Sequence, residues 1–122
     1  MAIEGQIPPA KAVRELKIKT GVVKRTLKED ASYEKEREQQ QRRVDAAIAA
    51  NADEYDIKKQ KEVLEETIRM LPDVRRRLVA ASNELLELLD KEEASLKDTE
   101  EFKAAKEVLT EAHSAIKAAQ RC

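Results

Sequence analysis

Glycine, proline and aromatic residues are scarce in this chain of 122 residues. It holds two glycines, three prolines, two tyrosines, one phenylalanine and no tryptophan. Hairpins and tight turns depend on glycine and proline, so this scarcity argues against a protein built from β-strands. The composition leaves a helical protein as the main possibility.

Residues that commonly carry chemistry are equally few. Cys122 is the single cysteine, so no internal disulfide can form, and His113 is the single histidine. There is no Cys/His cluster for zinc, no glycine-rich phosphate loop and no acidic calcium loop. His113 flanks Ala112 on a charged segment, where we expect a surface or boundary position. These absences predict a protein that is not an enzyme, with no catalytic, cofactor-binding or metal-binding residues.

Signals for membranes and nucleic acids are also missing. No apolar run approaches the roughly 18 residues of a membrane span, and the N-terminal "MAIEGQIPPAK" lacks the apolar core of a secretory signal. The net charge is −1. The arginine runs at 42–43 and 75–77 are flanked by acidic residues and have no aromatic platform beside them. We therefore expect a cytoplasmic protein that binds neither membranes nor nucleic acid.

The sequence is rich in charged residues, which make up 40% of it against roughly 25% in an average domain. Combined with many alanines and leucines, this is typical of long helices or a coiled coil. The length predicts a single domain. Apolar residues recur in steps of three and four, which predicts helices at about 11–50, 57–92 and 99–119 within one bundle spanning 11–119. Residues 1–10 are expected to form a flexible tail, and residues 120–122 a second tail.

Short breaks separate the three segments, and short connections make neighbouring helices antiparallel. The cap and turn candidates are Asn51, Asp53 and Asp56 at the first break, and Asp98 with Glu101, or Ser95 with Asp98, at the second. Pro72 falls inside the second segment, whose periodicity continues across it, so we expect a kink there. The predicted fold is all-α: an elongated up-down-up antiparallel three-helix bundle, coiled-coil-like, with a shorter third helix and a proline kink in the second.

The periodicity also assigns the side chains that point inward. Those of the first helix are Val13, Leu16, Thr20, Val23, Leu27, Asp30, Glu34, Arg37, Gln41, Val44 and Ile48. Those of the second are Ile57, Gln60, Leu64, Thr67, Leu71, Val74, Leu78, Ala81, Leu85 and Leu88, with Ile68 and Leu89 widening the stripe. In the third they are Phe102, Ala105, Leu109, Ala112 and Ile116.

One stretch of the first helix, "YEKEREQQQRR" (33–43), keeps the spacing but places polar residues at the inward positions. The third helix is short and should end beside about residue 32, so the polar stretch begins where its cover stops. Pairing the two long helices places Arg37 near Ile68 and Gln41 near Leu64. Either the long polar side chains cover these apolar groups, or another protein does.

We therefore predict a partner-binding surface on this part of the chain. Its residues are Tyr33, Arg37, Gln40, Gln41, Leu64 and Ile68. The alternative is an ordinary solvated helix face. Ile18 and Val22 form an apolar pair on the outer side of the first helix, which is either a partner or dimer contact or scattered surface residues.

Five segments resemble one known family. They are "LKIKTGVVKRTLKE" (16–29), "YEKE" (33–36), "YDIKKQKEVLEE" (55–66), "MLPDVRRRLVAA" (70–81) and "EEFKAAKEVL" (100–109). Their sequence and order are similar to those of tubulin-binding cofactor A, a tubulin-specific chaperone.

The resemblance implies a three-helix, non-enzymatic carrier of β-tubulin after its release from the chaperonin, without a nucleotide or metal cofactor. It implies a place beside the cytoskeleton, with other tubulin-folding cofactors as further candidate partners, and a chain that is either a monomer or a homodimer. The alternative function is a structural coiled-coil adaptor that bridges the proteins of a complex.

Overall fold

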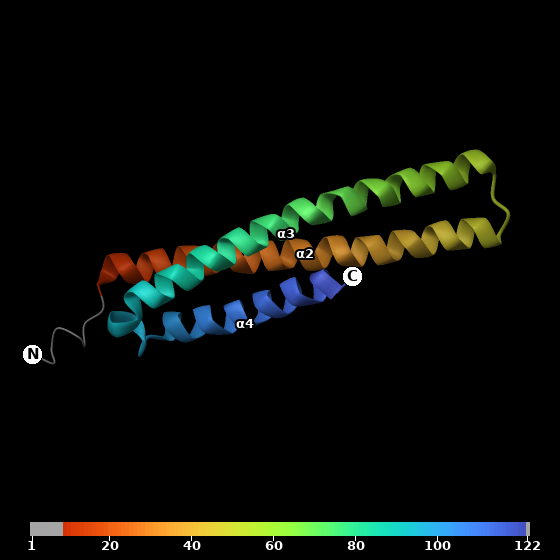
Figure 1. Cartoon of the computed structure of the whole chain (residues 1–122). Helices are drawn as coiled ribbons and strands as arrows, with labels where there is room; N and C mark the ends of the chain where they lie inside the picture. The colour runs from red at the N-terminus through yellow and green to blue at the C-terminus, as the bar shows by residue number, and fades with distance from the viewer. Residues whose placement is uncertain (1–8, 122) are drawn as a thin grey trace, which may run out of the picture. The chain divides into compact units, whose positions relative to one another are not determined.

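The computed structural model describes residues 9–121, and three α-helices account for almost all of them (Figure 1). They are α2 (Ala10–Ala49), α3 (Glu54–Leu96) and α4 (Glu100–Arg121). The described residues contain no strand. This confirms the all-α prediction and the shorter third helix, since α4 has 22 residues against 40 in α2 and 43 in α3. Most of the expected N-terminal tail, residues 1–8, and residue 122 lie outside the described residues.

The chain divides into two compact units, and both long helices pass through each of them. Of the described residues, 9–27 and 77–121 form one unit, which contains α4, and residues 28–76 form the other. We call these the three-helix unit and the two-helix unit. Within each unit α2 and α3 run antiparallel, and in the three-helix unit α4 runs antiparallel to α3 (Figure 1).

The three-helix unit holds the main hydrophobic core. Its fully buried aliphatic side chains include Leu16 and Val23 from α2 and Leu78, Leu85 and Leu96 from α3. From α4 the core receives Phe102, Ala105, Val108, Leu109 and Ala112. Burial of one such leucine side chain stabilises the fold by about 1.5–3 kcal/mol. The predicted inward residues of α3 are buried or half-buried except Ile68, which is exposed, and those of α4 are all buried or half-buried.

Hydroxyl side chains also occupy interior positions. Thr26 donates a hydrogen bond to the Val22 carbonyl at 2.8 Å, and Thr67 donates to the Val63 carbonyl at 3.2 Å. Both bonds reach back one helical turn, which satisfies the hydroxyl without help from another helix. The hydroxyls of Thr20 and Ser82 are buried and have no hydrogen-bond partner among the described residues.

The turn between α3 and α4 is capped by a residue that the sequence did not single out. The Thr99 hydroxyl accepts a hydrogen bond from the Phe102 amide at 3.1 Å and donates one to the Leu96 carbonyl at 2.7 Å. Thr99 therefore caps the start of α4 and the end of α3 together. The expected caps Asp98 and Ser95 do not serve, because α4 begins directly after Thr99 and Ser95 still belongs to α3.

The connection between α2 and α3 contains the turn and cap residues that were expected there. Asn51 adopts a left-handed backbone conformation with φ of 52°, a conformation that asparagine tolerates better than most residues. Asp53 directly precedes α3, whose first turn carries Glu54 and Asp56. Acidic side chains at this end interact favourably with the helix dipole. Further along, α3 continues through Pro72, so this proline does not end the helix, as the unbroken spacing predicted.

We expect Leu78→Ala and Leu109→Ala each to lower the free energy of unfolding by about 2–5 kcal/mol, because each leaves a cavity in the three-helix core. Urea denaturation followed by circular dichroism measures the loss. Gln41→Ala, at an exposed position of the two-helix unit, should cost far less. Equal losses at the three positions would contradict this assignment of the core.

Ser82→Ala tests a buried polar position in the same core. Ser82 is as buried as Leu78, yet its hydroxyl has no partner to lose, and alanine favours a helix more than serine does. We expect the Ser82→Ala protein to be at least as stable as the parent. A loss of more than about 1 kcal/mol would mean that the hydroxyl makes a hydrogen bond in solution.

Candidate partner-binding surface

The seam between the helices of the two-helix unit buries apolar residues of α3 together with Gln40 and Val44 of α2. Leu64, Leu71 and Val74 of α3 are buried there. Opposite them Gln40, only 3% exposed, donates through Nε2 to the main-chain oxygen of Gln60 at 2.9 Å and to its Oε1 at 2.6 Å. Such directional contacts satisfy a buried amide and fix the register of the two helices.

The expectation that Gln41 points inward was wrong, and Gln40 takes its place. Gln41 is exposed and donates to Asp45 Oδ1 at 3.1 Å on its own helix. Likewise Ile48 is exposed and Ala47 is half-buried. In this unit, therefore, Gln40 and Ala47 take the inward positions that the sequence pattern had assigned to Gln41 and Ile48.

The three-helix unit explains this error. There Thr20 of α2 lines a small hollow with Glu101 and Ala104 of α4, so its heptad position faces the third helix. Leu27, Glu34, Gln41 and Ile48 follow Thr20 at successive intervals of seven residues. Within the two-helix unit no third helix exists to receive the positions after Leu27, so Gln41 and Ile48 are exposed and Glu34 pairs with Arg75 of α3 instead. The predicted stripe therefore combined two series of positions, of which one serves α3 and the other serves α4.

A network of ion pairs closes one edge of the seam. Arg75 of α3 reaches Asp30 Oδ1 with its Nε at 3.1 Å and Glu34 Oε2 with its Nη2 at 2.8 Å. Arg37 pairs with Glu34 from the next turn of α2. The hydrogen bond from Arg37 and the positive charges of Arg37 and Arg75 hold the pKa of Glu34 below its ordinary value of 4.5, although partial burial acts in the opposite direction.

The other edge of the seam is open and combines apolar side chains with two carboxylates. A hollow of about 310 Å³ is lined by Tyr33 and Glu36 of α2 and by Val63, Glu66, Thr67 and Met70 of α3. Val63 is 47% exposed and Met70 is 40% exposed. Ile68, 45% exposed, lies on another side of α3, because five residues separate it from Val63 and turn the helix by about 140°. We call this depression the Tyr33 hollow.

The residues predicted to bind a partner are thus distributed over the unit. Gln40 and Leu64 are buried in the seam, and Arg37 is half-buried beside Glu34. Tyr33 lines the hollow, whereas Gln41 and Ile68 are exposed outside it. Sequence reasoning missed Val63 and Met70. Their spacing of seven residues, off the main stripe, was the available signal.

The outer pair Ile18 and Val22 is exposed as predicted, with Ile18 at 58%. With Lys19, Ala81 and Glu84 the pair lines a shallow hollow between α2 and α3 in the three-helix unit. Lys19 Nζ pairs with Glu84 Oε1 at 3.1 Å across it.

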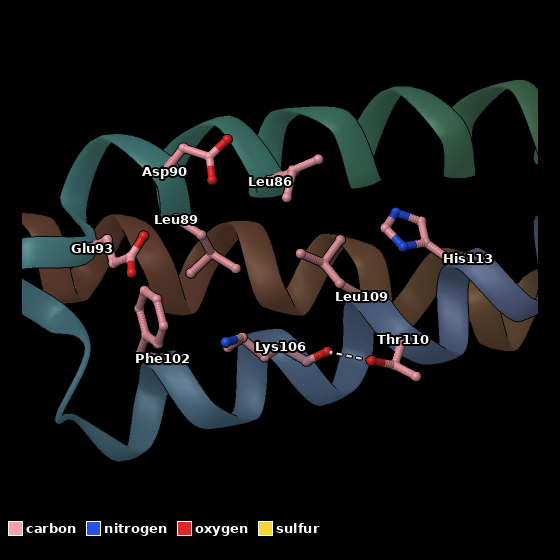
Figure 2. A pocket seen from close by; sticks show the side chains of 9 residues that line it. All are labelled: Leu86, Leu89, Asp90, Glu93, Phe102, Lys106, Leu109, Thr110 and His113. Atoms are coloured by element: carbon pink, nitrogen blue, oxygen red, sulfur yellow. Dashed lines mark hydrogen bonds between the residues drawn. The ribbon is translucent and has the colours of Figure 1, made fainter.

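A second groove of the three-helix unit runs between α3 and α4 and has a volume of about 270 Å³ (Figure 2). Its apolar side chains are Leu86, Leu89, Phe102 and Leu109. Asp90 and Glu93 line it from α3, whereas Lys106 lies on α4 with its Nζ 5.7 Å from the centre of the Phe102 ring. His113 is exposed at this groove, in agreement with the surface position expected for it.

Among residues 9–121 no group of three or more His, Cys, Asp or Glu side chains is arranged to hold a metal ion. None of the helices in this part of the chain combines the length and apolar character needed to cross a membrane. The accessible features are edges and grooves between helices. Fold and surface together define a helical binding protein.

Comparison with known proteins gives the family. Residues 11–109 match the family model of tubulin binding cofactor A, so the chain belongs to this family and the resemblance seen in its sequence is confirmed. Its members are non-enzymatic chaperones, which confirms the prediction that the chain is not an enzyme.

Similar proteins and solved structures support the same family. The chain is 50% identical over 97 residues to a tubulin-specific chaperone A of Bos taurus, covering 80% of this chain and 89% of the relative. The crystal structure of tubulin folding cofactor A from Arabidopsis thaliana matches with a TM-score of 0.82 at 36% identity, over 87% of this chain and 99% of that one. The human tubulin chaperone cofactor A matches with a TM-score of 0.72 at 46% identity, over 81% and 95% of the two chains.

Arg75→Met should lower the free energy of unfolding by about 1–3 kcal/mol, because Asp30 and Glu34 lose their partner on the opposite helix. The difference from the parent should depend on pH. Glu34, whose pKa is lowered first by Arg37 and further by Arg75, stabilises the fold above its ordinary pKa of 4.5, and this stability is lost as the pH falls through the lowered value. Arg75→Met removes only the part that Arg75 contributes. Urea denaturation at neutral and acidic pH measures the difference, which should shrink in acid.

The adjacent Arg76 provides the control. Its pair with Asp73 is exposed and joins residues of one helix, so Arg76→Met should change the stability by less than about 0.5 kcal/mol. A loss for Arg75→Met that stays constant from neutral to acidic pH would show that the ion pairs contribute nothing to it.

Proposed function

We propose that this chain is a tubulin-folding chaperone that binds β-tubulin intermediates after their release from the chaperonin, on the way to the tubulin heterodimer. The observation that carries the proposal is the family match over residues 11–109, which includes residues of all three helices. The resemblances to proteins named as tubulin-specific chaperones support it. We place the chain in the cytoplasm, where unassembled tubulin is found.

Capture of the client uses surface complementarity and no chemical step. We place the contact on the two-helix unit, where Tyr33, Gln41 and Ile68 are accessible around a seam that polar contacts hold in register. An aromatic side chain, an adaptable amide and an exposed aliphatic group are suited to a protein interface. Arg37 contributes through Glu34, which it helps to hold at the edge of the unit.

The alternative function is a coiled-coil adaptor that bridges the proteins of a complex. The two functions differ in their binding to free tubulin subunits, which an adaptor has no need to capture. Other tubulin-folding cofactors remain candidate partners. For these, or for a second copy of the chain in a homodimer, the exposed pair Ile18 and Val22 is the alternative contact.

The test is to mix the purified chain with labelled β-tubulin as a chaperonin releases it and to separate the products on a native gel. We expect a discrete complex of one chain with one β-tubulin. α-Tubulin released in the same way serves as the control and should not form this complex. Absence of any β-tubulin complex would favour the adaptor.

Two matched variants locate the contact. Ile68→Asp should reduce β-tubulin capture about tenfold, equivalent to roughly 1.4 kcal/mol, because it places a charge at an exposed apolar position of the two-helix unit. Ile18→Asp makes the same change at an exposed isoleucine of the three-helix unit and should leave capture unchanged. The reverse outcome would move the contact to the outer pair.

A further inference from the structure

The Tyr33 hollow is suited to a particular kind of partner segment. Val63 and Met70 lie about two turns apart on α3, with Thr67 between them, and Tyr33 lies across from them on α2. Thr67 donates its hydroxyl hydrogen to the Val63 carbonyl, so that hydrogen is not available to a ligand. Val63, Thr67 and Met70 follow one another at steps of four and three, the spacing of residues on one face of a helix.

The charges at the Tyr33 hollow are of one sign. Glu36 lines it from α2 and Glu66 from α3. Neither carboxylate has an ion-pair or hydrogen-bond partner among residues 9–121. At the opposite edge of the same unit, Asp30 and Glu34 are neutralised by Arg75. One edge is therefore internally compensated, and the other offers two carboxylates beside exposed apolar side chains.

We propose that the Tyr33 hollow binds a basic amphipathic helix of the client. Apolar side chains on one face of that helix would cover Val63 and Met70, and lysine or arginine residues flanking this face would pair with Glu36 and Glu66. Helices that place an apolar face in a groove and fix their orientation with charges at its rim are a recurrent mode of recognition. This proposal rests on the proposed function, since it names the chemistry of the segment that the chaperone holds.

The first test neutralises the two carboxylates in the full-length chain with Glu36→Gln and Glu66→Gln together. Capture of β-tubulin by the parent should weaken as the salt concentration rises, because salt screens exposed charges. The double variant should capture about tenfold less at low salt and lose most of this salt dependence. Glu38→Gln with Glu65→Gln is the matched control, because it removes two exposed glutamates from the same helices outside the Tyr33 hollow.

The outcomes separate this proposal from the function on which it rests. If the parent fails to capture β-tubulin, the proposed function fails. If parent and control capture β-tubulin and the Glu36→Gln, Glu66→Gln protein does so equally well with the same salt dependence, only the proposal for the hollow is overturned. A reduction of the same size in the control would also overturn it, because net charge alone would then explain the effect.

The second test identifies the segment with overlapping peptides of about 20 residues that cover the β-tubulin sequence, each long enough to form a helix. Fluorescence anisotropy measures their binding to the parent and to the double variant. The tightest peptide should be cationic and amphipathic, and it should bind the double variant about tenfold more weakly. Preference for an acidic or uncharged peptide would overturn the proposal. A homodimer that dissociates when Glu36 and Glu66 are neutralised would also overturn the proposal.

Discussion

The structure depends on α2, because this helix packs against α3 in both units but against α4 only in the three-helix unit. Its heptad provides two series of positions for these tasks. One series is Val23, Asp30, Arg37 and Val44, of which Asp30 pairs with Arg75 of α3 and Val23 and Val44 are buried. The series that includes Thr20 faces α4 in the three-helix unit. In the two-helix unit it continues with Glu34, which pairs with Arg75 of α3, and with the exposed Gln41 and Ile48.

The sequence was sufficient for the number of helices, for the shortness of α4 and for most of the interior face of α3, because these follow from periodicity; Ile68, which is exposed, is the exception. It was not sufficient to separate the two series on α2, since Gln40 and Gln41 are both glutamines and only the partner helix distinguishes them. The cap at Thr99 and the pair Val63 and Met70 were missed because both depend on how two helices meet.

The polar seam has a physical consequence for a chaperone. An apolar stripe between two helices tolerates slippage, whereas the bonds from Gln40 to Gln60 are satisfied in one register only. Polar contacts of this kind contribute less to stability than buried leucines do, but they keep the seam from offering a continuous apolar face to other proteins. The two-helix unit is therefore defined in register, and its exposed apolar side chains, such as Val63, Ile68 and Met70, lie outside the seam.

The same reasoning explains why the two edges of this unit are chemically different. Arg75 lies on the edge where Asp30 and Glu34 can engage it, and these ion pairs occupy its guanidinium. An arginine so engaged is not available to neutralise Glu36 or Glu66 at the Tyr33 hollow. The ion pairs at one edge thus leave the negative charge at the other edge uncompensated. This charge can attract a cationic segment, and because exposed ion pairs are weak, the segment can also dissociate.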